Sequence, residues 1–342
     1  MKNNDLAKYL TSFFTEYLAC ERGASHNTIR SYSNTFVLFL NYMDEMKHVK
    51  AENISVGHLK RKTVLDFLNW LQNEKFSKDS TRNQRLAAIH SFSRYMQYED
   101  VIHLEQWQEI LSIKIKKTEK RNVVYLSVEG MKLLLSQISR TTKTGRRDLA
   151  MIALLYDSGA RVQELIDLTP VDLHLVQPYY VTLFGKGKKK RLVPLREQQV
   201  KILKEYMEEN SLDRLAANQK PLFANNRGGK LTNAGVTYIL SQYAANARVA
   251  NPELMPKTIS PHCLRHSKAM HLLQAGVNLI YIRDILGHVS IQTTEIYARA
   301  DSKQKRQALE AAYFDVLPVI EEKSCKWEIT MHIFSQLGMY HF

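Results

Sequence analysis

Leu286-Gly287-His288-Val289-Ser290-Ile291-Gln292-Thr293-Thr294-Glu295-Ile296-Tyr297 is the most specific stretch of this sequence. A glycine just before His288 is typical of a helix end, and residues 290–298 predict a further short helix that carries Tyr297. One tyrosine among 17 would ordinarily be expected only to pack a helix. Two clusters upstream make a chemical role for Tyr297 the better hypothesis.

The upstream clusters are Pro261-His262-Cys263-Leu264-Arg265-His266 and Gly159-Ala160-Arg161-Val162-Gln163-Glu164-Leu165. Pro261 favours a helix start, so His262 and Arg265, three residues apart, share one helix face. Arg161 follows a predicted helix end, where a phosphate can use the start of the next helix as well as the guanidinium. Taken alone, this motif favours an arginine that merely pairs with Glu164 at the surface.

Together these residue types suit chemistry on a phosphodiester. Guanidinium groups offer a planar fork that matches phosphate oxygens. A phenol can attack phosphorus and hold it as an ester, and imidazoles can transfer protons near neutral pH. Lys186 lies in the turn Gly185-Lys186-Gly187-Lys188-Lys189-Lys190, where it is either part of a solvated basic loop or, with its pKa lowered by nearby cations, a general acid.

Length and charge limit the possible classes of protein. A chain of 342 residues is expected to form two domains, and 48 Lys and Arg against 34 Asp and Glu give a formal charge of +14. This excess favours a polyanionic partner without choosing among DNA, RNA and an anionic membrane. No run is long enough to span a membrane, and three distant cysteines predict no disulfide framework, which favours a reducing cytoplasm.

The pattern along the chain predicts a helical domain over residues 1–112, a basic linker over 113–124, a mixed domain over 125–316 and a tail of uncertain fold over 317–342. Ser25 is expected to begin one helix of the first domain, residues 62–72 form another, and Ser77 or Ser80 caps a fourth. The basic residues predicted to contact DNA are Arg82, Arg85, Lys116, Lys117, Lys188 and Lys190.

In the second domain, strand-forming residues at 179–184 and 191–195 around a glycine-bearing turn predict a β-hairpin. Hydrophobic periodicity predicts the surrounding helices. Their expected ranges are 127–139, 146–158, 196–208, 232–247, 262–275, 278–286, 290–298 and 303–316. The fold class is therefore mainly α with a small β-hairpin or sheet.

The motifs resemble those of the tyrosine recombinase (phage integrase) family from about residue 8 to about residue 316. The matching strings are Gly-Ala-Arg-Val-x-Glu-Leu, Gly-Lys-Gly-x-Lys-x-Arg-x-Val-Pro-Leu, His-x-x-Arg-His and Leu-Gly-His-x-Ser-x-x-Thr-Thr-x-x-Tyr. The resemblance implies an N-terminal core-binding (SAM-like) domain, a mixed α/β catalytic domain and a catalytic set formed by Arg161, Lys186, His262, Arg265, His288 and Tyr297. Lys188 remains a competitor of Lys186.

The same resemblance implies a reaction. Tyr297 would attack the scissile phosphate to give a 3′-phosphotyrosine and a free 5′-hydroxyl, Arg161 and Arg265 would neutralise the phosphorane, and recombination would pass through a Holliday junction. Lys186 would protonate the leaving oxygen, His288 would add a hydrogen bond, and His262 would serve as general base or acid. No metal, cofactor or ATP is expected.

The resemblance also implies partners. The expected substrate is double-stranded DNA, bound in the cytoplasm at the nucleoid, with no role for a membrane. The helix at 303–316 would dock onto a neighbouring subunit, which gives a homotetramer on paired sites and a dimer or monomer off DNA. The chain starts close to the helical domain, without an arm-binding module, and in this it resembles Xer-like or transposon-borne recombinases.

Three alternatives remain at this stage. A type IB topoisomerase shares nearly the same chemistry without joining two sites, and a relative that has lost catalysis would only bind DNA. His262, Cys263 and His266 could suggest zinc, although no fourth ligand stands at a suitable spacing. His266 is expected to be a buried, hydrogen-bonded support.

Overall fold

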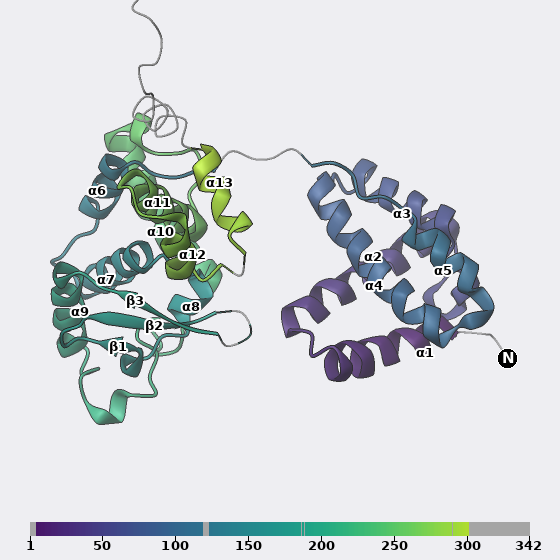
Figure 1. Ribbon diagram of the computed structural model, residues 1–342, viewed down its shortest axis with the longest axis horizontal. Coiled ribbons are helices and arrows are strands. Elements are labelled where there is room, and N and C mark those ends of the chain that lie inside the picture. Colours follow the sequence, from purple (N-terminus) through teal and green to yellow (C-terminus); the bar gives the residue numbers. More distant parts are fainter. Residues whose placement is uncertain (1–4, 119–122, 186, 188, 289, 301–342) are drawn as a thin grey trace, which may run out of the picture. The chain divides into compact units, whose positions relative to one another are not determined.

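The computed structural model describes residues 5–118, 123–185, 187, 189–288 and 290–300. The chain divides into two compact units, residues 1–121 and residues 122–342, here called the N-terminal and C-terminal units (Figure 1). Both units are built mainly from helices, and a three-stranded sheet lies in the C-terminal unit. This confirms the predicted fold class. No helix in the described ranges is long and apolar enough to cross a membrane.

The N-terminal unit is a bundle around an aromatic core. Its helices are α1 (Asp5–Ser12), which continues as a π-helix over Phe13–Glu21, α2 (His26–Lys47), α3 (Arg61–Asn73), α4 (Asp79–Glu99) and α5 (Leu104–Leu111). The side chains of Phe13, Phe39, Phe67, Phe92 and Trp107 are fully buried. Large aromatic residues at helical spacing supply most of the apolar area that such a small bundle can bury.

Two predicted helix starts can be compared with the structure. Ser25 is the N-cap of α2, and its side chain accepts a hydrogen bond of 3.3 Å from the backbone N–H of Thr28, which confirms that prediction. The prediction that Ser77 or Ser80 caps α4 is wrong, because the N-cap is Lys78, which makes no side-chain cap bond. Asp79 instead places a carboxylate in the first turn, where it interacts favourably with the helix dipole.

The first residues of the predicted linker belong structurally to the N-terminal unit. Ile113 is buried in the aromatic core. The backbone N–H of Lys116 donates to the side-chain oxygen of Asn83 at 3.0 Å, and the amide of Asn83 donates to the carbonyl oxygen of Lys116 at 2.8 Å. The chain is therefore held against α4 as far as Lys116.

The C-terminal unit alternates helices with one small sheet. Its elements are α6 (Val128–Ser136), α7 (Lys143–Ser158), α8 (Val162–Ile166), β1 (Leu173–His174), β2 (Tyr180–Phe184), β3 (Lys190–Pro194), α9 (Glu197–Glu209), α10 (Asn233–Ala250), α11 (Pro261–Gln274), α12 (Leu279–Leu286) and α13 (Gln292–Ala300). The predicted helix at 303–316 and the tail from 317 lie outside the described residues.

The sheet is antiparallel in the order β1-β2-β3, with Val181 opposite Val193. The predicted hairpin is therefore present as β2 and β3. Val181, Leu183 and Val193 are buried in the core of the unit. Strand β1 was not predictable, because two residues are too few to show an alternating pattern.

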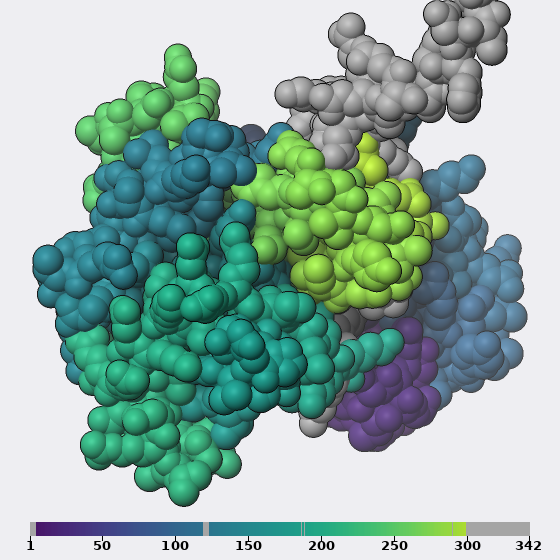
Figure 2. All heavy atoms as spheres, turned by 60° about the vertical axis from the view of Figure 1, so that its left-hand side comes forward, coloured from purple at the N-terminus to yellow at the C-terminus, as the bar shows by residue number. Residues whose placement is uncertain are grey.

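Helix α11 is the central element of the candidate site. It packs against α7, α12 and α13, while α12 also contacts β3. Figure 2 shows the yellow-green surface of α12 and α13 next to the teal surface of the strands. The segments with the three motifs and the hairpin are thereby brought together on one side of the C-terminal unit.

Candidate active site

Arg161 lies at the junction between α7 and α8. Gly159 ends α7 in the left-handed conformation with φ of +58°, which glycine adopts without a steric penalty. Arg161 is then the N-cap of α8, and its backbone N–H donates to Oε2 of Glu164 at 2.8 Å. Its guanidinium donates to Oε1 of Glu164 at 2.8 Å and to the carbonyl oxygen of Gly287 at 3.2 Å.

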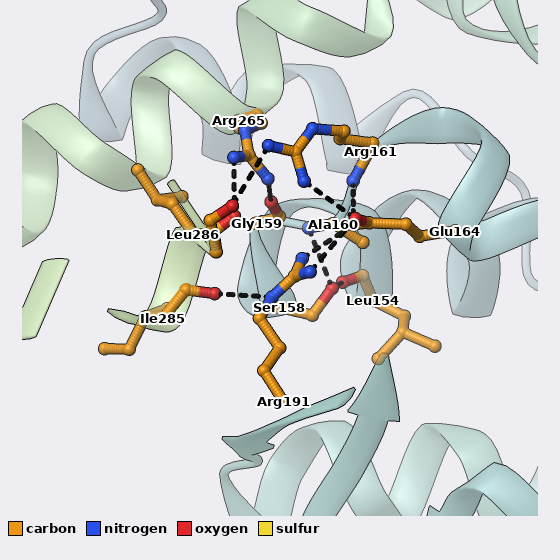
Figure 3. A network of polar contacts seen from close by, with 11 residues as sticks. Leu154, Ser158, Gly159, Ala160, Arg161, Glu164, Arg191, Arg265, Ile285 and Leu286 are labelled. Carbon is orange, nitrogen blue, oxygen red and sulfur yellow. Dashed lines mark hydrogen bonds and ion pairs between the residues drawn. The ribbon is translucent and has the colours of Figure 1, made fainter. Parts of the chain in front are cut away.

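Glu164 organises two arginines rather than one. Arg191 on β3 donates from both terminal nitrogens to the two carboxylate oxygens, at 3.0 and 2.6 Å, and its Nε donates to the carbonyl oxygen of Ile285 at 2.9 Å (Figure 3). Burial alone would raise the pKa of Glu164, but the hydrogen bonds from Arg191 and the backbone of Arg161 lower it. The carboxylate therefore stays ionised and holds both guanidinium groups.

Arg161 and Glu164 thus form the ion pair that the simpler interpretation of the motif predicts, but this pair does not lie at the surface. The side chain of Glu164 is 5% exposed, whereas that of Arg161 is 35% exposed. The carboxylate fixes the guanidinium from within, and the outer part of the guanidinium still faces solvent. A phosphate can approach Arg161 from that side.

Arg265 is the most buried of the cations that the structure describes at the site, with 3% of its surface exposed. It donates to the carbonyl oxygens of Gly159 and Leu286, both at 2.6 Å, and so connects the ends of α7 and α12 to α11 (Figure 3). Burial, followed by repulsion from Arg161, lowers the pKa of Arg265 to about 10. The guanidinium therefore remains charged at neutral pH.

Tyr297 lies against α11 and is 1% exposed. Its hydroxyl is 2.9 Å from Nδ1 of His266, which agrees with the predicted hydrogen bond of His266, although His266 is half-buried and not buried as expected. Burial raises the pKa of Tyr297, while the charges of Arg265 and Arg161 act in the opposite direction. The phenol is protonated at neutral pH.

The two predicted catalytic histidines lie on either side of this pair. The ring of His288 is parallel to that of Tyr297 at 6.4 Å between centroids, and its Nδ1 is 2.9 Å from the hydroxyl of Thr294. Burial, then the charges of Arg265, Arg161 and other nearby cations, lowers the pKa of His288 to about 4.

His262 lies in the first turn of α11, and its ring centroid is 6.4 Å from that of His266. The residue is exposed, but protein atoms crowd its ring and partly desolvate it. This effect, followed by repulsion from Arg265 and Arg161, lowers its pKa. His262 is therefore neutral at pH 7, like His288.

An open, mainly basic pocket lies beside the arginines. Arg161, Lys189, Lys190, Arg191, Gly287 and His288 are among the residues that line it. The backbone N–H of Gly185 donates to the carbonyl oxygen of Lys189 at 2.9 Å and closes the base of the hairpin turn. Lys186 and Lys188 lie outside the described residues, so their predicted roles stay predictions.

The predicted DNA contacts of the N-terminal unit differ in exposure. Arg82 is 4% exposed, and burial lowers its pKa. Arg85 donates to the carbonyl oxygen of Ser31 and to the hydroxyl of Thr35, both on α2. Lys116 donates to Oε1 of Gln72 at 2.6 Å, and Lys117 is exposed. DNA contacts from these side chains remain predictions.

Arg191 is a site residue that its motif alone did not single out. A signal was present in the alternation of β3, because Arg191 shares a strand face with buried Val193 while Lys190 and Leu192 are exposed. A basic residue on the inner face of a strand requires a partner, and here that partner is Glu164.

The zinc alternative finds no support in the described part of the chain. No group of three or more histidine, cysteine or acidic side chains there is arranged to hold a metal ion. Nδ1 of His266 is occupied by the hydroxyl of Tyr297, and burial raises the pKa of Cys263 to about 11, which disfavours the thiolate that zinc needs.

Comparison with known proteins identifies the class. Residues 124–304 match the phage integrase family, and residues 12–100 match the phage integrase N-terminal SAM-like domain. The chain therefore belongs to the phage integrase family. This confirms the resemblance on which the site prediction was based.

Individual relatives agree with this assignment. The chain is 35% identical to the tyrosine recombinase XerD of Oceanobacillus iheyensis over 85% of this chain and 94% of the relative. It is 32% identical to the tyrosine recombinase XerC of Thermodesulfovibrio yellowstonii over 86% of this chain and 92% of the relative.

Solved structures share the fold at lower identity. The Tn1549 transposon integrase in complex with transposon right end DNA superposes with a TM-score of 0.68 at 17% identity, over 89% of this chain and 99% of that one. The XerH site-specific recombinase in a post-cleavage complex with difH substrate gives a TM-score of 0.65 at 23% identity, over 84% and 81%.

Proposed function

We propose that this protein is a site-specific DNA recombinase that cuts and rejoins DNA through a covalent 3′-phosphotyrosine at Tyr297. The observation that carries the proposal is the convergence of Arg161, Arg265 and Tyr297 from three distant segments on α8, α11 and α13. Arg265 on α11 binds the carbonyl oxygens of Gly159, at the end of α7 just before Arg161, and of Leu286, at the end of α12.

The geometry supports a division of labour among the site residues. Arg161 and Arg265 neutralise charge on the pentacoordinate phosphorane, because hydrogen bonds hold both guanidinium groups in place before that charge develops. His288, neutral at pH 7, donates a hydrogen bond to a non-bridging oxygen. His262 exchanges protons on the exposed side of the site, and Lys186 protonates the leaving 5′ oxygen. The ester at Tyr297 conserves the bond energy, so rejoining requires no ATP.

The proposed substrate is double-stranded DNA at paired sites, exchanged through a Holliday junction by a homotetramer that is a dimer or monomer off DNA. A net charge of +14 favours a polyanion. The XerH and Tn1549 proteins of similar fold are both described in complexes with DNA. The proposed location is the cytoplasm, at the nucleoid.

A pool of nicked duplexes with randomised sequence tests the cleavage step. When Tyr297 attacks close to a nick, the short 5′-hydroxyl fragment diffuses away and the covalent complex accumulates. We expect denaturation-resistant protein–DNA complexes to form in excess EDTA, because guanidinium charges replace a metal ion. The recovered sequence as an intact duplex is the control, and it should give little adduct because it is resealed.

Two outcomes would contradict this proposal. Failure to trap any covalent complex from the pool would favour a relative that only binds DNA. Loss of trapping in EDTA, with restoration by Mg²⁺, would contradict cleavage by arginines alone. A supercoiled plasmid carrying two recovered sites then separates the remaining classes: a recombinase deletes or inverts the intervening segment, whereas a type IB topoisomerase relaxes plasmids without paired sites.

A further inference from the structure

The phenolic oxygen of Tyr297 lies 2.9 Å from Nδ1 of His266, within ordinary hydrogen-bond distance. The two ring centroids are 5.7 Å apart and the ring planes are inclined by 59°. Because Tyr297 is 1% exposed, bulk water has little access to its side chain at this position. Tyr297 cannot attack phosphorus efficiently unless some group removes that proton.

The two histidines of the family motifs are less suited to remove it. His288 lies parallel to Tyr297 with its Nδ1 engaged by the hydroxyl of Thr294, at 2.9 Å. His262 lies one turn before His266 on α11, with its ring 6.4 Å from that of His266. Of these three imidazoles, His266 is the one that lies within hydrogen-bond distance of the Tyr297 hydroxyl.

We propose that His266 is the general base that accepts the phenolic proton of Tyr297 as this oxygen attacks phosphorus. The inference rests on the proposed function and assigns a catalytic role to a residue that was expected only to support the site. In this arrangement His262 exchanges protons with the bound DNA and not with Tyr297.

The proton balance of the step is simple. The O–H bond of Tyr297 breaks and its proton goes to Nδ1 of His266, which becomes an imidazolium. The Tyr297 oxygen forms a bond to phosphorus, and the bond from phosphorus to the 5′ oxygen breaks, with a proton supplied by a separate acid. In the rejoining step the imidazolium returns its proton to the departing phenolate, as microscopic reversibility requires.

The charges around His266 fit a base that is unprotonated before DNA binds. Burial, followed by repulsion from His262 and Arg265 on the same helix, lowers the pKa of His266, so it is neutral at pH 7. His288 and Tyr297 are the titratable groups that face His266 from other elements, and the charge of Arg161 acts to lower the pKa of both. A bound phosphate brings negative charge next to Arg161 and Arg265 and therefore raises the proton affinity of His266.

The variant His266→Asn distinguishes a general base from a residue that only holds Tyr297 in place by a hydrogen bond. The side-chain oxygen of asparagine can accept a hydrogen bond from Tyr297 near the place of Nδ1, but it does not take up a proton at neutral pH. We expect single-turnover cleavage of the recovered nicked duplex to slow by about 100-fold or more near pH 7. The remaining rate should rise about tenfold per pH unit toward the raised pKa of the phenol.

The chain offers a matched control on the same helix. His271 makes an equivalent pair, with its Nδ1 2.8 Å from the hydroxyl of Tyr156. His271→Asn should keep the unmodified cleavage rate and its pH profile. His262→Asn is the competing variant, and a log-linear pH profile there, with His266→Asn unaffected, would make His262 the base and overturn the proposal.

Measurement of the unsubstituted protein gives an answer even if His266→Asn does not fold. With His266 as base, the cleavage rate should be nearly independent of pH around and above neutrality, because the pKa of this imidazole is lowered and the base is already unprotonated there. A rate that continues to rise about tenfold per unit from about pH 7 to about pH 9 would mean that hydroxide generates the phenolate, and His266 would not be the base.

The two proposals fail in different ways. If the unsubstituted protein forms no adduct, the proposed function fails. If it forms the adduct while a folded, DNA-binding His266→Asn protein cleaves at the same rate with a flat profile, only the role of His266 fails.

Discussion

Arg191 links the hairpin to the rest of the site at the level of single residues. Through Glu164 and the carbonyl oxygen of Ile285 it ties β3 to α8 and to the end of α12. The turn that carries Lys186 begins directly after β2 and ends at β3.

Lys186→Ala should slow cleavage of an ordinary phosphodiester by about 100-fold or more, because the leaving 5′ oxygen then departs without a proton. A substrate with sulfur at the 5′ bridging position should restore the rate, because a thiolate leaves without protonation. The measurement is single-turnover cleavage of both substrates.

Lys188→Ala is the comparison for this experiment, since it removes an equal charge two residues away. Sulfur rescue of Lys188→Ala instead would transfer the role of general acid to Lys188. Rescue of neither variant would mean that the hairpin only grips phosphate.

The junction between α12 and the loop of His288 depends on a glycine. Gly287 ends α12 with φ of +65°, and an added Cβ would lie 2.9 Å from Nη1 and 3.0 Å from Cδ of Arg191. Both the backbone conformation and the close approach of Arg191 therefore require glycine at this position.

Gly287→Ala should destabilise the protein and slow cleavage by displacing Arg191 from Glu164. Gly276→Ala is the matched control, because Gly276 has φ of +81° but no atom within 4 Å of an added Cβ. The control should lose only about 1–2 kcal/mol of unfolding free energy, because alanine is strained in the left-handed conformation. Its cleavage rate should be unchanged. Thermal unfolding and single-turnover cleavage provide the two readouts, and equal effects of both substitutions would show that the contact with Arg191 is unimportant.

Most elements were predictable because their signals are local. Apolar spacing gave the helices that became α2, α3 and α9–α13, and Gly287 marked the end of α12. The two-residue strand β1 and the cap of α4 were not predictable, since the first is too short for a pattern and the second uses Lys78 without a side-chain bond.

The composition of the site was predictable from motifs, but its connections were not. Motif spacing indicated Arg161, Arg265, His288 and Tyr297, yet the bonds from Arg265 to the ends of α7 and α12 are tertiary. The contact between Tyr297 and His266 likewise depends on how α13 packs on α11. Such contacts leave no periodic trace in one sequence.

Burial of neutral histidines gives the whole molecule a defined response to pH. The pKa is lowered for His90, His262, His266, His271 and His288, in each case chiefly by burial or desolvation. The unfolded chain then binds more protons than the folded one below about pH 6.5. This stability is fully present above that pH and is lost as the pH falls toward the folded pKa values.

We therefore expect the thermal unfolding midpoint to fall between about pH 7 and about pH 5 at constant salt, before most carboxylates titrate. His288→Asn should reduce this fall, because the pKa of His288 is lowered to about 4. His26→Asn, at an exposed position on α2, serves as the control. A midpoint that does not change over this range would contradict the burial of neutral imidazoles.

The central claim is that Tyr297 forms the bond to DNA, and mapping the attached residue tests it most directly. The covalent complex with the recovered nicked duplex is digested with protease and nuclease, and the nucleotide-bearing peptide is identified by mass spectrometry. We predict attachment at Tyr297, loss of the adduct in Tyr297→Phe with DNA binding retained, and a normal adduct in Tyr281→Phe, whose side chain is exposed on α12. An adduct that persists in Tyr297→Phe, or that maps to another residue, would contradict the account.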